Sequence, residues 1–184
     1  RKIYYITLTL KKVVMKKIIF LISILNLMYG QVERPVCGTP SIPQEQVEQI
    51  GSAVEHWSSQ RNGDRNEMKM IFVAWHIVHA TNGQGNYGDD VAYDAIAWLN
   101  ETFAPHNFAF ELDTITRTEN DQWFGNWYSD VFQGAAALNI DPFHNMNVYT
   151  ADLYSSGVAG FSYLANSFPA GDYRHSVNMD YRDL

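Results

Sequence analysis

The chain has 184 residues, 46% of them hydrophobic and 18% charged, with a formal net charge of −7. Six of the 13 basic side chains lie within residues 1–30, which hold no acidic one, so the rest carries 7 basic against 20 acidic residues. Such an acidic chain lacks the basic footprint of nucleic-acid binding proteins, so we expect no nucleic-acid partner. The roughly 150 residues after the first thirty suffice for one domain with a real core and not for two.

Residues 1–30 have the pattern of a secretory signal peptide with upstream read-through before it. Met15 is the expected start, a basic pair and an apolar run over residues 18–25 follow, and Gly30 is the expected cleavage point. The apolar run is too short to span a bilayer. We therefore expect a secreted, extracellular protein with no stable membrane anchor once the signal is removed.

Cys37 is the only cysteine, and it lies just after this signal in the sequence Arg-Pro-Val-Cys-Gly-Thr-Pro, residues 34–40. Such a thiol forms an intermolecular disulfide, stays idle and buried, or serves as a thiolate metal ligand. Gly38 lets the backbone approach a metal, and Pro40 favours an extended chain before it. The segment resembles the latency segment of secreted zinc proteases of the metzincin clan, in which the sulfur occupies the coordination position that water needs for catalysis.

The elements of the remaining chain are predicted from the period of their apolar residues. Helical spacing indicates the helices, β-branched and aromatic runs or alternation indicate the strands, and Pro105 ends the second helix. Strands alternating with helices predict an α/β unit with a largely parallel sheet. In chain order we expect a helix over 44–57, a polar link over 61–66, a strand over 68–79, a helix over 89–103, a strand over 108–115, a short helix over 135–138, and strands over 145–151, 157–163 and 176–180.

This order of elements resembles the pappalysin family of metzincin proteases, bacterial branch, over about residues 34–180. The resemblance implies a zinc endopeptidase made as a latent precursor, or zymogen. Its upper subdomain would be a twisted, mostly parallel five-stranded sheet with a backing helix, and the fourth strand would run antiparallel along the rim of the cleft. The matching segments are Phe-Val-Ala-Trp-His-Ile-Val at 72–78, Trp-Leu-Asn-Glu-Thr-Phe at 98–103, Asn-Ile-Asp-Pro at 139–142, Asn-Val-Tyr at 147–149 and Gly-Val-Ala-Gly-Phe at 157–161.

The resemblance also implies a division of the chain and two candidate sites. Residues 31–66 would be the pro-segment, with Cys37 as the zinc ligand of a cysteine switch, and residues 67–184 the amino-terminal half of the protease domain. The rim strand would bind peptide or protein substrates through its unpaired backbone edge, and its glycines would leave room for their approach. The residues of this candidate substrate site are Val158, Ala159, Gly160, Phe161 and Ser162.

The zinc-binding signature of these enzymes, H-E-x-x-H-x-x-G-x-x-H, is absent from the chain. We therefore expect an amino-terminal fragment, inactive as given, whose ligand histidines lie beyond Leu184. His76 and His79 are three apart in a predicted strand and point to opposite faces, so we expect them in the core or on the surface rather than on a metal. Two alternatives stay open: a secreted, non-catalytic binding or adhesion domain, and an inactive relative of the proteases.

Overall fold

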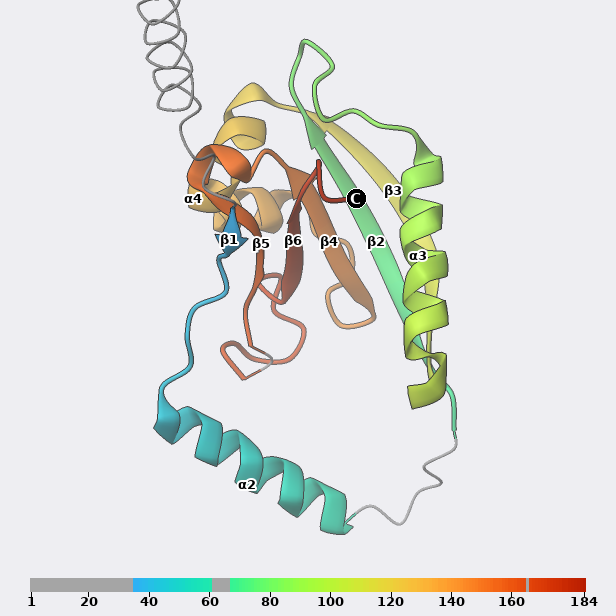
Figure 1. Cartoon of the computed structure of the whole chain (residues 1–184), viewed down its shortest axis with the longest axis vertical. Helices are drawn as coiled ribbons and strands as arrows, with labels where there is room; N and C mark the ends of the chain where they lie inside the picture. The colour runs from blue at the N-terminus through green and yellow to red at the C-terminus, as the bar shows by residue number, and fades with distance from the viewer. Residues whose placement is uncertain (1–34, 61–66, 165) are drawn as a thin grey trace, which may run out of the picture. The chain divides into compact units, whose positions relative to one another are not determined.

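A computed structural model describes residues 35–60, 67–164 and 166–184. The predicted signal peptide and the polar link over 61–66 lie outside these residues. The described part forms one six-stranded sheet with the order β1-β5-β6-β4-β2-β3 (Figure 1). Its strands are β1 (Val36–Cys37), β2 (Lys69–His79), β3 (Phe108–Glu119), β4 (Asn145–Ala151), β5 (Val158–Ser162) and β6 (Ser176–Asp180).

The predicted fold class is confirmed, with one strand more than expected. All neighbouring strands run parallel except β5 and β6, which pair antiparallel, as predicted for the fourth strand of the protease sheet. The additional strand is β1, which pairs parallel with β5. Two residues carry too short a pattern to be recognised as a strand from the sequence, and the neighbour that orders them follows about 120 residues later in the chain, as the Val36–Val158 pair shows.

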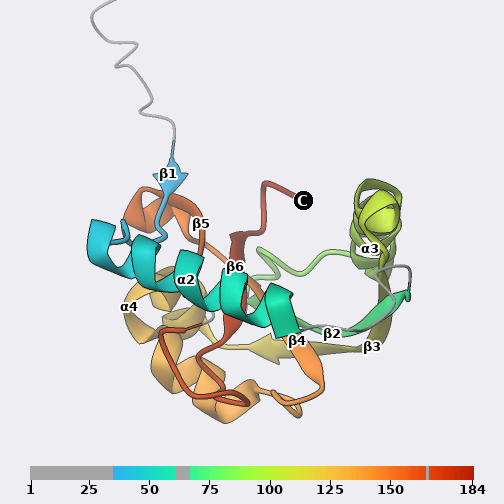
Figure 2. The same cartoon turned by 90° about the horizontal axis from the view of Figure 1, so that it is seen from below.

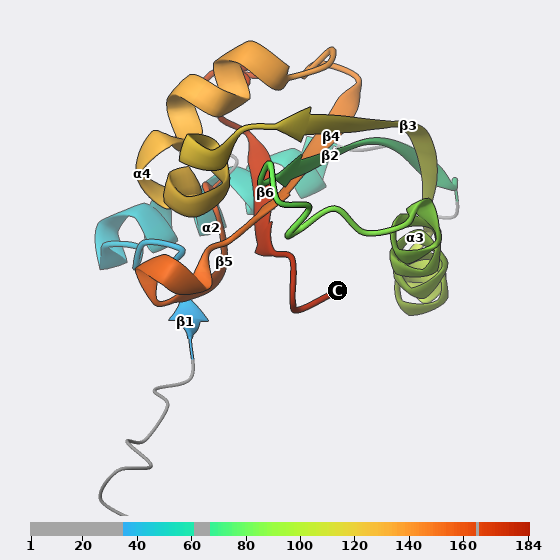
Figure 3. The same ribbon diagram turned by 90° about the horizontal axis from the view of Figure 1, so that it is seen from above.

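Three longer helices accompany the sheet: α2 (Gln44–Gln60), α3 (Asp89–Phe103) and α4 (Asp121–Leu138). Short 3₁₀ turns at Ala104–His106 and Tyr154–Ser156 precede β3 and β5. Helices α3 and α4 lie on opposite faces of the sheet (Figure 3). Among the described helices, none combines the length and the apolar character that crossing a membrane requires.

Helix α4 is much longer than the expected helix over 135–138. The Asn120 side chain caps its start by accepting a hydrogen bond from the Trp123 amide at 2.9 Å. Trp127 and Ala135 are fully buried on one side of the helix. Gly125 and Gly134 weaken the helical pattern of the sequence, so residues 121–134, about four turns, were not predicted as helix. Within them, Asn126 has a non-helical backbone (φ −127°, ψ 23°).

The sheet has a hydrophobic cluster on each face. The cluster under α4 is rich in aromatic rings, whereas the cluster beside α3 is mostly aliphatic, with Trp75 of β2 as its one buried aromatic ring. Figure 2 shows α3 nearly end-on beside β2 and β3. The α4-side cluster contains Val78, Ala80, Phe124, Trp127, Val131, Ala135, Tyr149, Ala151, Leu153, Val158 and Phe161. The α3-side cluster contains Val73, Trp75, Ile77, Ala92, Ile96 and Val148.

A buried carboxylate fixes the turn that leads into β5. Asp180, at the end of β6, has no exposed surface, and it accepts hydrogen bonds from the Leu153 amide at 2.7 Å and the Tyr154 amide at 2.8 Å. The guanidinium of Arg182 lies 2.7 Å from the same carboxylate. Gly157 then has φ +72°, a left-handed conformation that favours glycine. These constraints set where β5 begins.

Candidate functional site at the β1–β5 edge

The outer edge of β5 is occupied by the chain itself. The Val36 amide donates to the Gly157 carbonyl at 3.1 Å, and the Gly38 amide donates to the Gly160 carbonyl at 2.8 Å. The Ser162 amide donates to the Thr39 hydroxyl at 3.1 Å. The predicted rim strand therefore exists over the expected residues, but the expectation of an unpaired edge is wrong for this chain, because the segment around Cys37 pairs with it.

The glycines near this edge have a different use from the one expected. A Cβ at Gly160 would lie 3.0 Å from the Asn178 carbonyl oxygen of β6, so Gly160 allows close pairing inside the sheet rather than the approach of an outer strand. Gly38 is the glycine at the contact between the Cys37 segment and β5. A Cβ there would lie 2.6 Å from Val158 Cγ1 and 3.2 Å from Tyr128 Cε2, so only glycine lets β1 lie this close to β5.

Cys37 is exposed on β1 and forms no disulfide. Hydrogen bonds from the Thr39 hydroxyl and from the Thr39 amide hold the pKa of its thiol below the usual value, because both favour the thiolate. Of the three explanations of Cys37, the exposure of its side chain argues against a buried thiol, whereas an intermolecular disulfide and a metal ligand stay open. The contact of Thr39 with the thiol was not predicted from the sequence, although its place two residues after the cysteine was an available signal.

Cys37 is a suitable ligand for zinc but supplies only one of the four that a site needs. Within the described residues, no three His, Cys, Asp or Glu side chains lie close enough together to hold a metal ion. His76 is not a candidate, because its ring is fully engaged in the core. Its Nδ1 lies 2.7 Å from Thr116 Oγ1, its Nε2 lies 2.9 Å from Asn147 Oδ1, and burial lowers its pKa.

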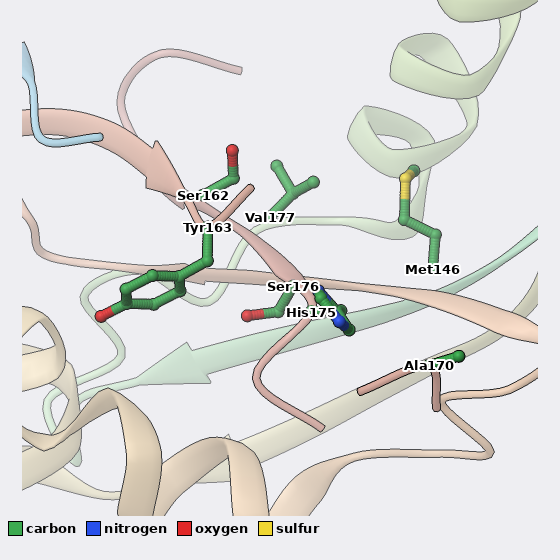
Figure 4. A pocket seen from close by; sticks show the side chains of 7 residues that line it. All are labelled: Met146, Ser162, Tyr163, Ala170, His175, Ser176 and Val177. Atoms are coloured by element: carbon green, nitrogen blue, oxygen red, sulfur yellow. The ribbon is translucent and has the colours of Figure 1, made fainter. Parts of the chain in front are cut away.

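A hollow of about 450 Å³ opens beside Cys37 on the α3 side of β5 and β6. A second hollow of about 400 Å³ adjoins it, since Ser162 and Val177 line both, and the two hollows together are called the trough below. Figure 4 shows the side chains around the second hollow. The first is lined by Cys37, Thr39, residues 159–162, residues 177–179 and Asp183, and the second by Met146, Ser162, Tyr163, Ala170, His175, Ser176 and Val177.

The far end of the trough is held by the loop between β5 and β6. His175 Nε2 donates to the Phe168 carbonyl at 3.0 Å. Arg174 binds Asp172 with two nitrogens, at 2.8 and 2.7 Å, and these bonds lower the pKa of Asp172 to about 2. The Arg174 guanidinium also lies 3.9 Å from the centre of the Phe168 ring. Residues 168–175 of the loop are therefore held by contacts among themselves.

Two extracellular metalloproteases are similar to the chain in sequence. The protein of Verticillium alfalfae is 33% identical over 99 residues, which are 53% of this chain and 34% of the relative. The protein of Colletotrichum graminicola is 28% identical over 142 residues, which are 73% of this chain and 49% of the relative. The chain thus spans between a third and a half of the length of these relatives. A comparison with models of protein families gives no match.

The fold is shared with promirolysin from Tannerella forsythia, solved as a point mutant. The superposition has a TM-score of 0.58 and 18% sequence identity, and it covers 80% of this chain and 60% of that one. The α/β fold expected from the pappalysin resemblance is therefore confirmed. The similarity in sequence to two extracellular metalloproteases supports a relationship with this class of protein.

Proposed function

We propose that the chain is the pro-segment and upper subdomain of a secreted zinc-dependent endopeptidase, made as a zymogen and held latent by a cysteine switch. The observation that carries the proposal is the pairing of the Cys37-bearing strand with β5. This places an exposed thiol with a lowered pKa at the edge where a peptide was expected to bind. The similarity to two extracellular metalloproteases supports the hydrolase class and export from the cell.

Zinc is the proposed cofactor, and Cys37 is the residue of this chain that would hold it in the latent form. The hydrogen bonds from Thr39 favour the thiolate, which is the form of cysteine that binds zinc. Bound zinc would activate water and polarise the peptide carbonyl. The other ligands would be the three histidines of H-E-x-x-H-x-x-G-x-x-H, encoded beyond Leu184.

Peptide or protein substrates are the proposed partners of residues 158–162 once β1 has left. The Gly157 and Gly160 carbonyls and the Ser162 amide are the groups that β1 now satisfies, and these main-chain groups would accept a peptide as an added strand. Latency would then have two parts: the thiolate on the metal and a strand of the chain on the substrate edge.

The reading frame of the gene beyond Leu184 is the direct test. We expect a helix with H-E-x-x-H-x-x-G-x-x-H within roughly 10–40 residues, since that spacing provides three zinc ligands and a catalytic Glu. A stop codon directly after Leu184, together with a soluble monomer that unfolds cooperatively, would overturn the proposal. It would favour a secreted binding or adhesion domain.

The role of Cys37 is tested in the protein translated from the whole reading frame. Cys37→Ala removes the thiolate, so we expect the precursor to mature or autolyse faster, measured by the time course of its cleavage on gels. Ser41→Ala, which alters an exposed hydroxyl in the same segment, should mature like the wild type. Unchanged latency of Cys37→Ala would show that Cys37 is not the switch.

A further inference from the structure

Strand β1 is short, and Thr39 adds to it a contact that is not part of a normal strand ladder. Strand β1 pairs with β5 over two residues only, and the Val36 and Gly38 amides add main-chain hydrogen bonds at its two ends. A further contact, at Ser162, uses the side-chain hydroxyl of Thr39 as the acceptor in place of a main-chain carbonyl. Pro40 follows directly and has no amide hydrogen to donate, so the ladder is interrupted beyond this point.

The Thr39 hydroxyl joins the two sides of this contact. Its oxygen accepts the Ser162 amide of β5, and the same hydroxyl can donate to the sulfur of Cys37 on β1, whose pKa it lowers. One hydroxyl can donate one hydrogen bond and accept two, so both contacts are compatible. The same group therefore fixes the end of β1 on the sheet and the direction of the thiol.

We propose that Thr39 is the positioning residue of the latent form: its hydroxyl holds the Cys37-bearing strand on β5 and determines how readily that strand leaves the edge. The proposal deepens the proposed function, because it names the residue that controls exposure of the same edge. Because its ladder is only two residues long, β1 would open locally far more often than the interior of the sheet.

Amide hydrogen exchange of the chain, resolved by NMR at single residues, tests this. Thr39→Val keeps the shape of the side chain and removes the hydroxyl. Losing one hydrogen bond should accelerate exchange about three- to ten-fold. If Thr39 holds the whole strand, the amides of Val36, Gly38 and Ser162 accelerate together, because they open in one event. Thr39→Ser keeps the hydroxyl and should restore the rates to within about two-fold of the wild type.

The controls separate this effect from a general loss of stability. Ser41→Ala should leave the exchange of all three amides unchanged. The amide of Val73, in the buried part of β2, should exchange equally slowly in every variant. Unchanged rates in Thr39→Val, or acceleration of the Ser162 amide alone, would overturn the proposal, since Thr39 would then bind one amide without holding the strand.

This experiment needs neither zinc nor proteolysis, so its failure is distinct from failure of the protease proposal. If the three amides accelerate together and no zinc motif follows Leu184, Thr39 holds the strand in a protein that is not a protease. If the motif is present and the amides do not respond, the precursor is held by other contacts.

Discussion

His76 makes the stability of the chain depend on pH in a predictable direction. The imidazole is 1% exposed and stacks on Tyr149 with 4.5 Å between the ring centres. Burial lowers its pKa in the folded state below 6.5. Below pH 6.5 the unfolded chain therefore binds more protons at this residue than the folded chain does. The contribution of neutral His76 to the free energy of unfolding is therefore complete above about pH 6.5 and is lost as the pH falls below that value.

We predict that the free energy of unfolding falls less in His76→Gln than in the wild type between pH 7.5 and pH 5, since the side-chain amide of glutamine does not titrate. Urea unfolding at the two pH values measures this difference. His106→Gln, which replaces an exposed histidine, should keep the pH dependence of the wild type. The same fall in stability in His76→Gln and in the wild type would contradict the assignment.

The hydroxyl of Tyr149 is buried, and no group among the described residues forms a hydrogen bond with it. Burial without a partner costs about 1–3 kcal/mol, so Tyr149→Phe should leave the free energy of unfolding unchanged or raise it by about 1 kcal/mol. Tyr87 is the matched contrast, since its hydroxyl bonds Trp75 Nε1 at 2.8 Å and Thr150 Oγ1 at 2.7 Å. Tyr87→Phe should lower the free energy of unfolding by about 1–3 kcal/mol, because it leaves both partners without their hydrogen bond. An equal loss in Tyr149→Phe would reveal an ordered water on its hydroxyl.

In helix α4, Gly134 lies against Trp127, a ring of the same helix that packs against Tyr149 of the sheet. A Cβ at Gly134 would lie 2.4 Å from Cζ3 of Trp127, a fully buried ring that has no room to move. Gly134→Ala should therefore lower the free energy of unfolding by about 1–3 kcal/mol, in spite of the better helix propensity of alanine. Gly125→Ala, on the same helix with nothing within 4 Å, should be neutral or stabilising by up to about 1 kcal/mol. Urea unfolding measures both, and equal effects would contradict the packing argument.

The elements that could be predicted from the sequence are those whose pattern is local and long. Strand β2 and helix α3 appear within a residue of their expected bounds, because an apolar run and a helical period are visible in the chain itself. Strand β1 escaped prediction because its order comes from a partner distant in sequence. Cys37 was recognised because its motif is local in the sequence. The contact of Thr39 with Ser162 was not predicted, because the two residues lie far apart in the chain.

The whole sheet is unevenly covered on its α3 side. Helix α3 packs near β2 and β3, whereas the trough runs along β5 and β6. Met146, Val177 and Met179 are only partly buried there. Under the proposed function, the helix with the zinc ligands would cover this part of the sheet, so the apolar side chains of the trough would become interior.

The chain alone should therefore bind an apolar dye through the trough. We expect dye fluorescence to fall in Met179→Gln, because a polar side chain replaces one apolar side of the trough, and to fall further in a longer chain that supplies the missing cover. Trp98, which is 64% exposed on α3, provides the control: Trp98→Gln should leave dye binding largely unchanged if the trough is the site. If Trp98→Gln abolishes the signal and Met179→Gln does not, the dye reports the outer surface of α3. The trough would then not be an exposed apolar surface, and nothing would support a further helix lying over it.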